Sequence, residues 1–199
     1  MGFDKIETRP LGKGSVEYGI IHGNRTLILI KSETDSLRHK HLQMAKALHE
    51  QIGATVICAP SPKTCSSEMQ DYTLLREIIN EKKGEPTLYF IGISSGALQG
   101  LFSATRQFGF KRLFLINMPL SPYIQRLKAA LLRGDAHICF FYGEKASDNA
   151  DIVCLHSAIH CLQYAPKKLV LSKKTVTLDI IPNTNRSFIK ALVERISEE

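Results

Sequence analysis

The stretch that decides how this chain is organised is Leu88-Tyr89-Phe90-Ile91-Gly92-Ile93-Ser94-Ser95-Gly96. Its first part is an apolar run with the length of a buried strand, and a segment with helical spacing of apolar residues follows at 96–108. Between them lies the pattern Gly-x-Ser-x-Gly. Glycines on both sides of a serine permit a sharp turn, because residues without a β-carbon let a strand and a helix pack closely. The stretch therefore predicts a strand, a tight turn that presents Ser94, and a helix.

The same alternation continues on both sides of this stretch. Apolar and β-branched runs indicate strands at 16–21, 26–30, 54–59, 87–93, 112–116, 136–142 and 175–181. Apolar residues at helical spacing lie between residues 37 and 52 and at 72–81, 96–108, 121–132, 150–162 and 186–196. This order predicts an α/β fold with a mostly parallel sheet covered by helices on both faces. The first two strands are joined by residues 22–25 and are expected to open the sheet as an antiparallel hairpin.

The totals set limits on the class of protein. A chain of 199 residues with 44% hydrophobic residues is long enough for one substantial core, so we expect a single domain over residues 1–199. The first ten residues carry charges instead of an apolar run, and no stretch of about 18 apolar residues occurs, so neither a secretory signal nor a membrane partner is expected. Five cysteines without a C-x-x-C pair favour a reducing compartment, which makes the expected location cytoplasmic.

Other ligands receive little support from the sequence. The net charge of +7 is spread along the chain and not clustered with aromatic residues, so no nucleic-acid partner is expected. The segment Gly12-Lys13-Gly14-Ser15 resembles part of a phosphate-binding loop, but the spacing G-x-x-x-x-G-K-[ST] is absent, which leaves nucleotide binding as a weak alternative. His156 and His160 lie four residues apart without a third ligand, so no metal and no cofactor is expected.

The motif around Ser94, together with the order of strands and helices from residue 16 onward, resembles the α/β-hydrolase family. The resemblance implies that Ser94 is a nucleophile on a nucleophile elbow and that the backbone amide of Ser95 forms one arm of an oxyanion hole. Many hydrolases carry His-Gly after the first parallel strand, whereas this chain has Lys31-Ser32-Glu33-Thr34. A backbone amide from Ser32 or Glu33 would then supply the second arm.

The acid of the implied catalytic triad is expected on residues 140–148, which resemble the strand and loop that carry it in this family. Asp148 is the preferred acid and Asp151 the second choice. Both precede a predicted helix, where Asp is a common capping residue, so capping remains an alternative to catalysis. Only one helix with short loops is predicted between the fourth and fifth parallel strands, so the chain looks like a small member of the family without a lid.

The chain departs from the family in the position of the base. The family places its catalytic histidine after the last strand, but no histidine follows His160. The corresponding loop carries Asn183, Asn185 and Arg186, which suit an anionic ligand beside a helix N-terminus. The expected triad is therefore atypical.

A histidine from elsewhere in the chain, or a water positioned by Asn183, Asn185 or Arg186, would have to replace the missing base. His39 is the preferred substitute, because it begins, with His41, the helix that leaves the sheet at the edge where the parallel strands end. The remaining candidates are expected at the opposite edge, and they are His22, His49 and His137.

Two functions therefore remain open. The first is a serine hydrolase that acts on a small ester, thioester or related acyl compound through Ser94. The second is a catalytically degenerate relative that binds a ligand or partner, because a serine without a base reacts slowly. An uncovered edge strand would also permit a homodimer.

Overall fold

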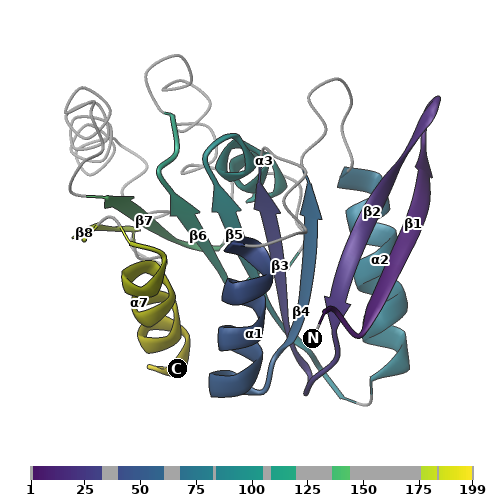
Figure 1. Cartoon of the computed structure of the whole chain (residues 1–199), viewed down its shortest axis with the longest axis horizontal. Coiled ribbons are helices and arrows are strands. Elements are labelled where there is room, and N and C mark those ends of the chain that lie inside the picture. Colours follow the sequence, from purple (N-terminus) through teal and green to yellow (C-terminus); the bar gives the residue numbers. More distant parts are fainter. Residues whose placement is uncertain are drawn as a thin grey trace, which may run out of the picture.

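The computed structural model describes residues 2–32, 40–60, 68–82, 84–104, 109–119, 136–143, 176–182 and 184–198. The strands are β1 (Lys5–Leu11), β2 (Gly14–Ile21), β3 (Thr26–Ser32), β4 (Thr55–Pro60), β5 (Thr87–Ile93), β6 (Arg112–Ile116), β7 (His137–Gly143) and β8 (Val176–Ile181). The helices are α1 (Lys40–Ile52), α2 (Glu68–Glu81), α3 (Ser95–Ala104) and α7 (Asn185–Ser197). The strands form one eight-stranded sheet in the order β1-β2-β4-β3-β5-β6-β7-β8 (Figure 1).

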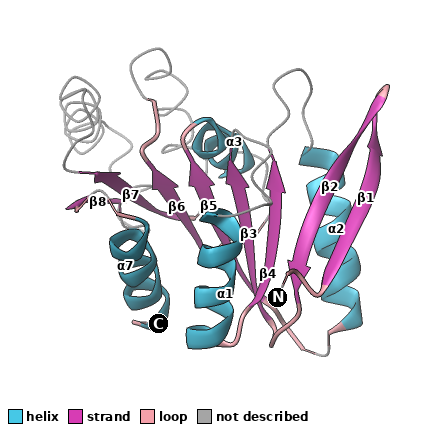
Figure 2. Ribbon diagram, viewed as in Figure 1, coloured by secondary structure: helices cyan, strands magenta, loops and turns pink. Residues whose placement is uncertain are grey.

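The strands from β3 to β8 are parallel, and the opening pair is antiparallel. Helices lie on both faces of the sheet, as Figure 2 shows. The predicted fold class, a mostly parallel sheet that opens with an antiparallel hairpin, is thus confirmed. Since parallel strands end at a common edge, β3, β5, β6 and β7 bring the segments that follow them to one side of the molecule.

The hairpin itself differs from the prediction. Residues 16–21 do not pair with residues 26–30; β2 pairs instead with β1, through a turn in which Gly12 has φ 61°. Strand β4 lies between β2 and β3. The segment 12–15 thus joins two antiparallel strands and does not lead into a helix, which removes the structural basis for a phosphate-binding loop.

The local sequence suggested a turn at residues 22–25, but this segment is held by the connection between α1 and β4. The amide of Gly23 donates to Thr55 Oγ1 at 2.9 Å, and the amide of Asn24 donates to the carbonyl of Gly53 at 2.7 Å. These hydrogen bonds fix the segment against the start of β4, so that β3 begins on the far side of β4 from β2, in the centre of the sheet. Strand β3 is buried on both faces there, which satisfies its continuous apolar run better than an edge position would.

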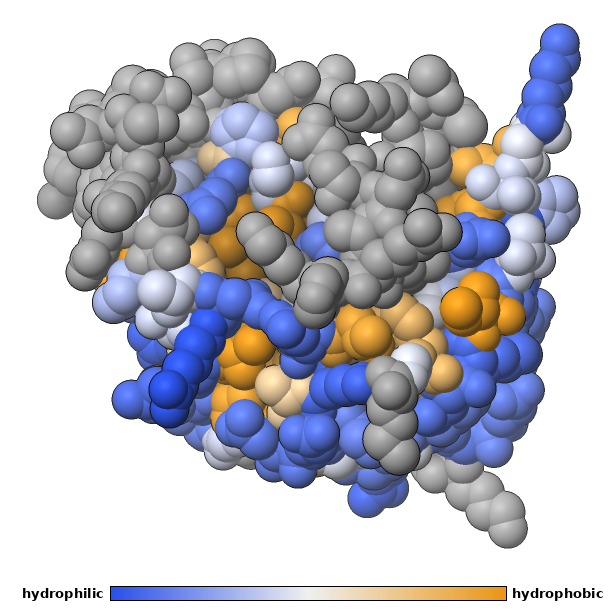
Figure 3. Space-filling model, viewed as in Figure 1, coloured by the Kyte–Doolittle hydropathy of each residue, from blue (hydrophilic) through white to orange (hydrophobic). Residues whose placement is uncertain are grey.

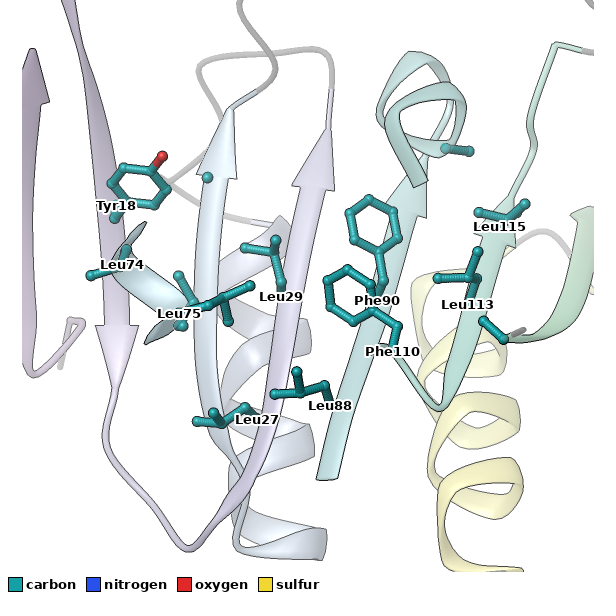
Figure 4. Packing of buried hydrophobic residues seen from close by; sticks show 14 of the residues in the cluster. Tyr18, Leu27, Leu29, Leu74, Leu75, Leu88, Phe90, Phe110, Leu113 and Leu115 are labelled. Atoms are coloured by element: carbon teal, nitrogen blue, oxygen red, sulfur yellow. The ribbon is translucent and has the colours of Figure 1, made fainter. Parts of the chain in front are cut away.

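A hydrophobic cluster lies on each face of the sheet. On one face, strand residues such as Leu29, Phe90 and Leu115 share a cluster with Leu74 and Leu75 of α2 (Figure 4). Each fully buried side chain of this size contributes about 1.5–3 kcal/mol relative to its exposed state. This face also carries α3, whose Ala97 belongs to the same cluster.

On the other face, α1 and α7 lie side by side (Figure 1). Ile28, Phe114 and Phe141 of the sheet pack with Leu48 of α1 and Leu192 of α7. The space-filling view of this face shows hydrophobic residues between the two helices and hydrophilic residues on their outer surfaces (Figure 3). None of the helices that the structure describes is long and apolar enough to cross a membrane.

Candidate active site

Ser94 stands at the turn between β5 and α3, and its backbone is in the left-handed region with φ 54°. For a residue with a β-carbon, such a conformation costs on the order of 1–3 kcal/mol and persists only where neighbours hold it. Two hydrogen bonds do so. The amide of Ser94 donates to the carbonyl of Ile116 at 2.9 Å, and its carbonyl accepts from the amide of Ala97 at 3.0 Å. The predicted sharp turn from strand to helix is therefore confirmed.

The two glycines of the motif are required by close approach of backbone segments. A β-carbon on Gly92 would lie 2.4 Å from Cα of Ala97, in the first turn of α3. A β-carbon on Gly96 would lie 2.3 Å from the carbonyl oxygen of Lys31 and 2.8 Å from the backbone nitrogen of Ser32. Both obstacles are backbone atoms, so they cannot rotate away. Helix α3 thus packs directly on β5 and on the end of β3.

The amides of Ser95 and Ser32 lie on the two elements that meet at this turn. Ser95 is the first residue of α3, where a helix leaves its amides without carbonyl partners from its own backbone. Ser32 is the last residue of β3 and pairs in register with Ile93, which directly precedes Ser94. The side chains of Ser94 and Ser95 are partly buried, and Ser32 is buried. The structure thus places Ser32 beside the turn formed by Ser94 and Ser95, and the roles of the Ser95 and Ser32 amides in an oxyanion hole remain predictions.

A second left-handed residue lies at the end of the neighbouring strand. Asn117 follows β6 with φ 46°, and its amide donates to the carbonyl of Phe141 at 2.8 Å. Its side-chain oxygen accepts from the amide of Gly143, the last residue of β7, at 2.9 Å. The ends of β6 and β7 are therefore joined beyond their regular pairing, at the same edge as Ser94.

A buried polar cluster lies beneath the end of β3. Lys31 Nζ donates to Asp71 Oδ2 at 2.6 Å, and the hydroxyl of Tyr18 donates to Asp71 Oδ1 at 2.6 Å. The exposed fractions are 1% for Lys31, 6% for Asp71 and 0% for Tyr18. Burial, followed by the negative charge of Asp71, raises the pKa of Tyr18 far above its usual value. The cluster joins β2, β3 and α2 with one ion pair and one hydrogen bond.

Several of the predicted site residues lie outside the part of the chain that the structure describes. They are Glu33, His39, Asp148, Asp151, Asn183, His156 and His160. Their roles remain predictions. The same holds for the expected absence of a lid, because residues 120–135 are also outside the described ranges.

Two members of the predicted ligand-binding loop are described, in the first turn of α7. Thr184 caps this helix by accepting a hydrogen bond from the amide of Ser187 at 3.1 Å. Asn185 Nδ2 donates to Gln43 Oε1 of α1 at 3.4 Å, and Arg186 is exposed. The side chain of Asn185 therefore contributes to the contact between α1 and α7, and its predicted role with a ligand remains untested.

The described histidines are distributed as expected. His137 is the first residue of β7, and His22 lies between β2 and the start of β3. His49 is in the last turn of α1, where its Nδ1 lies 3.0 Å from the carbonyl oxygen of Ala54. These three belong to the edge opposite Ser94. His41 is buried in the first turn of α1, which begins at the edge where β3 ends.

Two features of the site were missed in the sequence. A lysine inside the run Thr26–Ser32 is a signal for a buried ion pair, because a buried cation needs a partner, but the sequence does not name Asp71. Asn117 directly after a buried strand is a signal for a left-handed residue, since Asn tolerates this conformation better than most.

Comparison with solved structures finds the same fold in several proteins that are described as esterases, hydrolases or hydrolase homologues. The chain is similar to the esterase domain of a Rhodothermus marinus protein (13% identity, TM-score 0.63, 98% of this chain and 96% of that chain). It is also similar to an alpha-beta serine hydrolase homologue from Coxiella burnetii (12% identity, TM-score 0.67, 100% and 98%). A third similar structure is a dienelactone hydrolase from Anabaena variabilis (15% identity, TM-score 0.64, 98% and 94%).

No model of a known protein family and no curated protein sequence matches the chain. The similarity at 12–15% identity concerns the fold, and together with the strand order it shows that this chain has the α/β-hydrolase fold.

Proposed function

We propose that the protein is a serine hydrolase that acts on a small ester, thioester or related acyl compound, with Ser94 as the nucleophile. The observation that carries the proposal is the left-handed Ser94 between β5 and α3, held by Ile116 and Ala97 and next to the end of β3. Strained backbone conformations of this kind, held in place by their neighbours, cluster at functional sites.

The reaction follows from the groups that surround this turn. Ser94 Oγ attacks the carbonyl carbon of the substrate while a base takes its proton, and the carbonyl oxygen becomes an oxyanion. The amides of Ser95 and Ser32 donate to this oxygen, and the positive end of α3 favours its charge. The intermediate collapses as the alcohol or thiol leaves with the proton. Water then hydrolyses the acyl group on Ser94 by the same steps.

The base and the acid of this reaction are assigned from the sequence. His39 is the proposed base, and Asp148 the proposed acid that orients it. His41 is the second candidate for the base, because its helix begins at the edge that carries Ser94. A histidine within hydrogen-bond reach of a serine raises its nucleophilicity by taking the proton in the transition state.

Labelling with a fluorophosphonate probe tests the proposal. The wild-type protein is expected to react at Ser94, located by mass spectrometry, and Ser94→Ala is expected not to react. Ser95→Ala is the matched control: it removes the neighbouring hydroxyl but keeps the amide, so its labelling should resemble that of the wild type. His39→Ala and His41→Ala then identify the base as the variant that slows labelling by about 100-fold or more. Folded wild-type protein that remains unlabelled would contradict the proposal.

A second function is favoured by one specific feature of the chain. The segment from Pro182 to Ser187 follows the last strand, where the resemblance to α/β-hydrolases implies the catalytic histidine, and it contains no histidine. A protein with the elbow but without a base would bind an acyl compound or a partner and turn it over only very slowly. Under this alternative, the labelling rate would be the same in the wild type, His39→Ala and His41→Ala.

A further inference from the structure

We propose that the buried cluster of Lys31, Asp71 and Tyr18 is a positioning device that fixes the end of β3, and with it the amide of Ser32, relative to Ser94. The inference rests on the proposed function, since its consequence for activity requires Ser94 to react. Its structural half concerns where the Ser32 amide lies and can be tested separately.

The first step is the geometry of the cluster. Asp71 on α2 accepts one short hydrogen bond on each carboxylate oxygen, from Lys31 on β3 and from Tyr18 on β2, both at 2.6 Å. Strand β4 lies between these two strands, and its Ala59, the register partner of Lys31, contributes only a methyl group. Figure 4 shows the hydroxyl of Tyr18 directed toward β4. The two donors therefore reach Asp71 over Ala59 from both sides.

The second step is the surroundings of the cluster. Tyr18 and Ala59 belong to the same hydrophobic cluster as Leu29, which lies two residues before Lys31 on the same face of β3. Ion pairs taken out of water gain little net stability, and apolar residues of similar size often replace them without loss. The ion pair does, however, permit only a narrow range of positions, because each charge must remain against its partner. A constraint on the position of β3 is thus its most direct effect.

The third step connects this constraint to Ser94. The side chain of Lys31 is bound to α2, while its carbonyl faces Gly96, where a β-carbon would lie only 2.3 Å away. The end of β3 is therefore held from its side chain by α2 and from its backbone by α3. Ser32 is the next residue, and its nitrogen would lie 2.8 Å from the same β-carbon. A shift of Lys31 would move this amide relative to Ser94.

An apolar version of the cluster separates positioning from stability. In the variant Tyr18→Phe/Lys31→Met/Asp71→Leu, both charges of the ion pair and the hydroxyl are removed together, so neither charge of this pair is left opposite an apolar side chain. The matched control, Asp179→Leu/Arg195→Met, removes the ion pair between β8 and α7, whose N–O distance is 3.0 Å. Both variants are compared with the wild type in thermal unfolding, in hydrolysis of p-nitrophenyl acetate and in the backbone amide signals of Ser32 and Ser95 by NMR.

The expected result is a triple variant that unfolds within a few degrees of the wild type but has a kcat at least tenfold lower, with KM changed less than threefold. Its Ser32 amide signal should move, whereas the control variant keeps both its activity and this signal. A triple variant with wild-type kcat would overturn the inference. If the triple variant does not fold, Tyr18→Phe alone replaces it: a kcat at least twofold lower at unchanged KM is expected, and an unchanged kcat would overturn the inference.

Failure of the proposed function gives a different pattern. If the wild type neither reacts with the fluorophosphonate probe nor hydrolyses the ester, Ser94 is not a nucleophile. The positioning role of the cluster is then tested by the backbone amide signals alone. A Ser32 signal that moves in the triple or Tyr18→Phe variant, and not in the control, supports the positioning role. A signal that stays in place contradicts it.

Discussion

The side-chain oxygen of Asn117 accepts a hydrogen bond from the amide of Gly143 at 2.9 Å, so the residue that directly follows β6 also holds the end of β7. One strand earlier, the amide of Ser94 donates to the carbonyl of Ile116. The ends of β5, β6 and β7 are thus connected in series, and the connection contains Ser94 and Asn117, the two non-glycine residues with left-handed backbones in the described part of the chain. Hydrogen bonds at the end of β6 therefore link the end of β7 to the turn that presents Ser94.

The stability of Asn117 variants should depend on two properties of the residue: its side-chain oxygen acceptor and its tolerance of a left-handed backbone. Asn117→Asp keeps the oxygen acceptor and should lie within about 1 kcal/mol of the wild type. Asn117→Gly adopts the left-handed backbone easily but leaves the Gly143 amide without its partner, at a cost of about 1–2 kcal/mol. Asn117→Ala loses the bond and is strained as well, so it should cost about 2–3 kcal/mol. Urea unfolding measures these differences, and an Ala variant as stable as the Gly variant would contradict the role of the backbone.

The glycines of the elbow should not tolerate even a methyl group. Gly96→Ala places a β-carbon against backbone atoms of Lys31 and Ser32, so it should cost about 1–3 kcal/mol or more and abolish labelling of Ser94. Gly14→Ala is the control, because the nearest atom to its β-carbon is a carbonyl oxygen at an ordinary 3.8 Å. Thermal unfolding and fluorophosphonate labelling provide the two measurements. Equal stability of both variants would show that α3 does not pack this closely on β3.

Alkaline pH should unfold the protein partly through Tyr18. Burial and the charge of Asp71 raise the pKa of Tyr18 in the folded state. In the unfolded chain the hydroxyl has its usual pKa of about 10, so above this pH the unfolded chain loses the hydroxyl proton while the folded chain keeps it. The free energy of unfolding therefore falls as the pH rises above 10. Burial also raises the pKa of the Cys58 thiol, which acts in the same direction.

The variant Tyr18→Phe isolates the contribution of this residue. It should be less stable than the wild type at pH 7 by about 1 kcal/mol, because Asp71 loses a hydrogen bond. Above pH 10 its stability should fall less steeply, so the two curves approach each other. Urea unfolding between pH 7 and pH 11 measures both. Parallel curves over this range would contradict a raised pKa of Tyr18.

Acid should loosen the attachment of β1 to α2. Arg9 forms ion pairs with Glu7 on its own strand and with Glu77 on α2, and its hydrogen bond lowers the pKa of the Glu77 carboxyl. Because the pKa of Glu77 is lower in the folded state, its ion pair stabilises the protein fully at pH values above the ordinary carboxyl pKa of about 4.5. This stabilisation is lost as the pH falls through the pKa that Glu77 has in the folded state. Glu77→Gln should therefore unfold at a slightly lower temperature at pH 7 and at the same temperature as the wild type near pH 2. Thermal scans at both pH values, with Glu81→Gln as the control, check this expectation.

The parts of the fold that were predicted correctly depend on local patterns. The motif from Gly92 to Gly96 is a local signature of a strand, a turn and a helix, so the sequence alone predicted all three. The contacts that require Gly96 and hold Ser94 come from β3 and β6, and the motif does not name them. The end of the first parallel strand, with Ser32 or Glu33 as the expected amide donor, was also predicted at the edge that carries Ser94, and the structure places Ser32 in register with Ile93 there. The first expectation follows from a local pattern, and the second from the general geometry of parallel sheets.

The parts that were missed depend on which distant segments meet. The predicted pairing of residues 16–21 with 26–30 was wrong, because β4, about thirty residues later in the chain, lies between the two strands and pairs with both. The partner of Lys31 is forty residues away on α2, and no local pattern distinguishes Asp71 from the other acidic residues. Periodicity predicts which face of an element is buried, but it does not predict which element covers that face.

The bond from Ser94 to Ile116 has a consequence for protein engineering. A fragment that ends with α3 would contain the complete five-residue motif, yet it would lack β6 and the carbonyl that holds the strained serine. If the same five residues were placed in another strand–turn–helix unit, the serine would leave its left-handed conformation unless an adjacent parallel strand supplied a carbonyl to its amide, as Ile116 does here. The smallest transferable unit of this elbow is therefore three adjacent strands, β3, β5 and β6, with α3 across them.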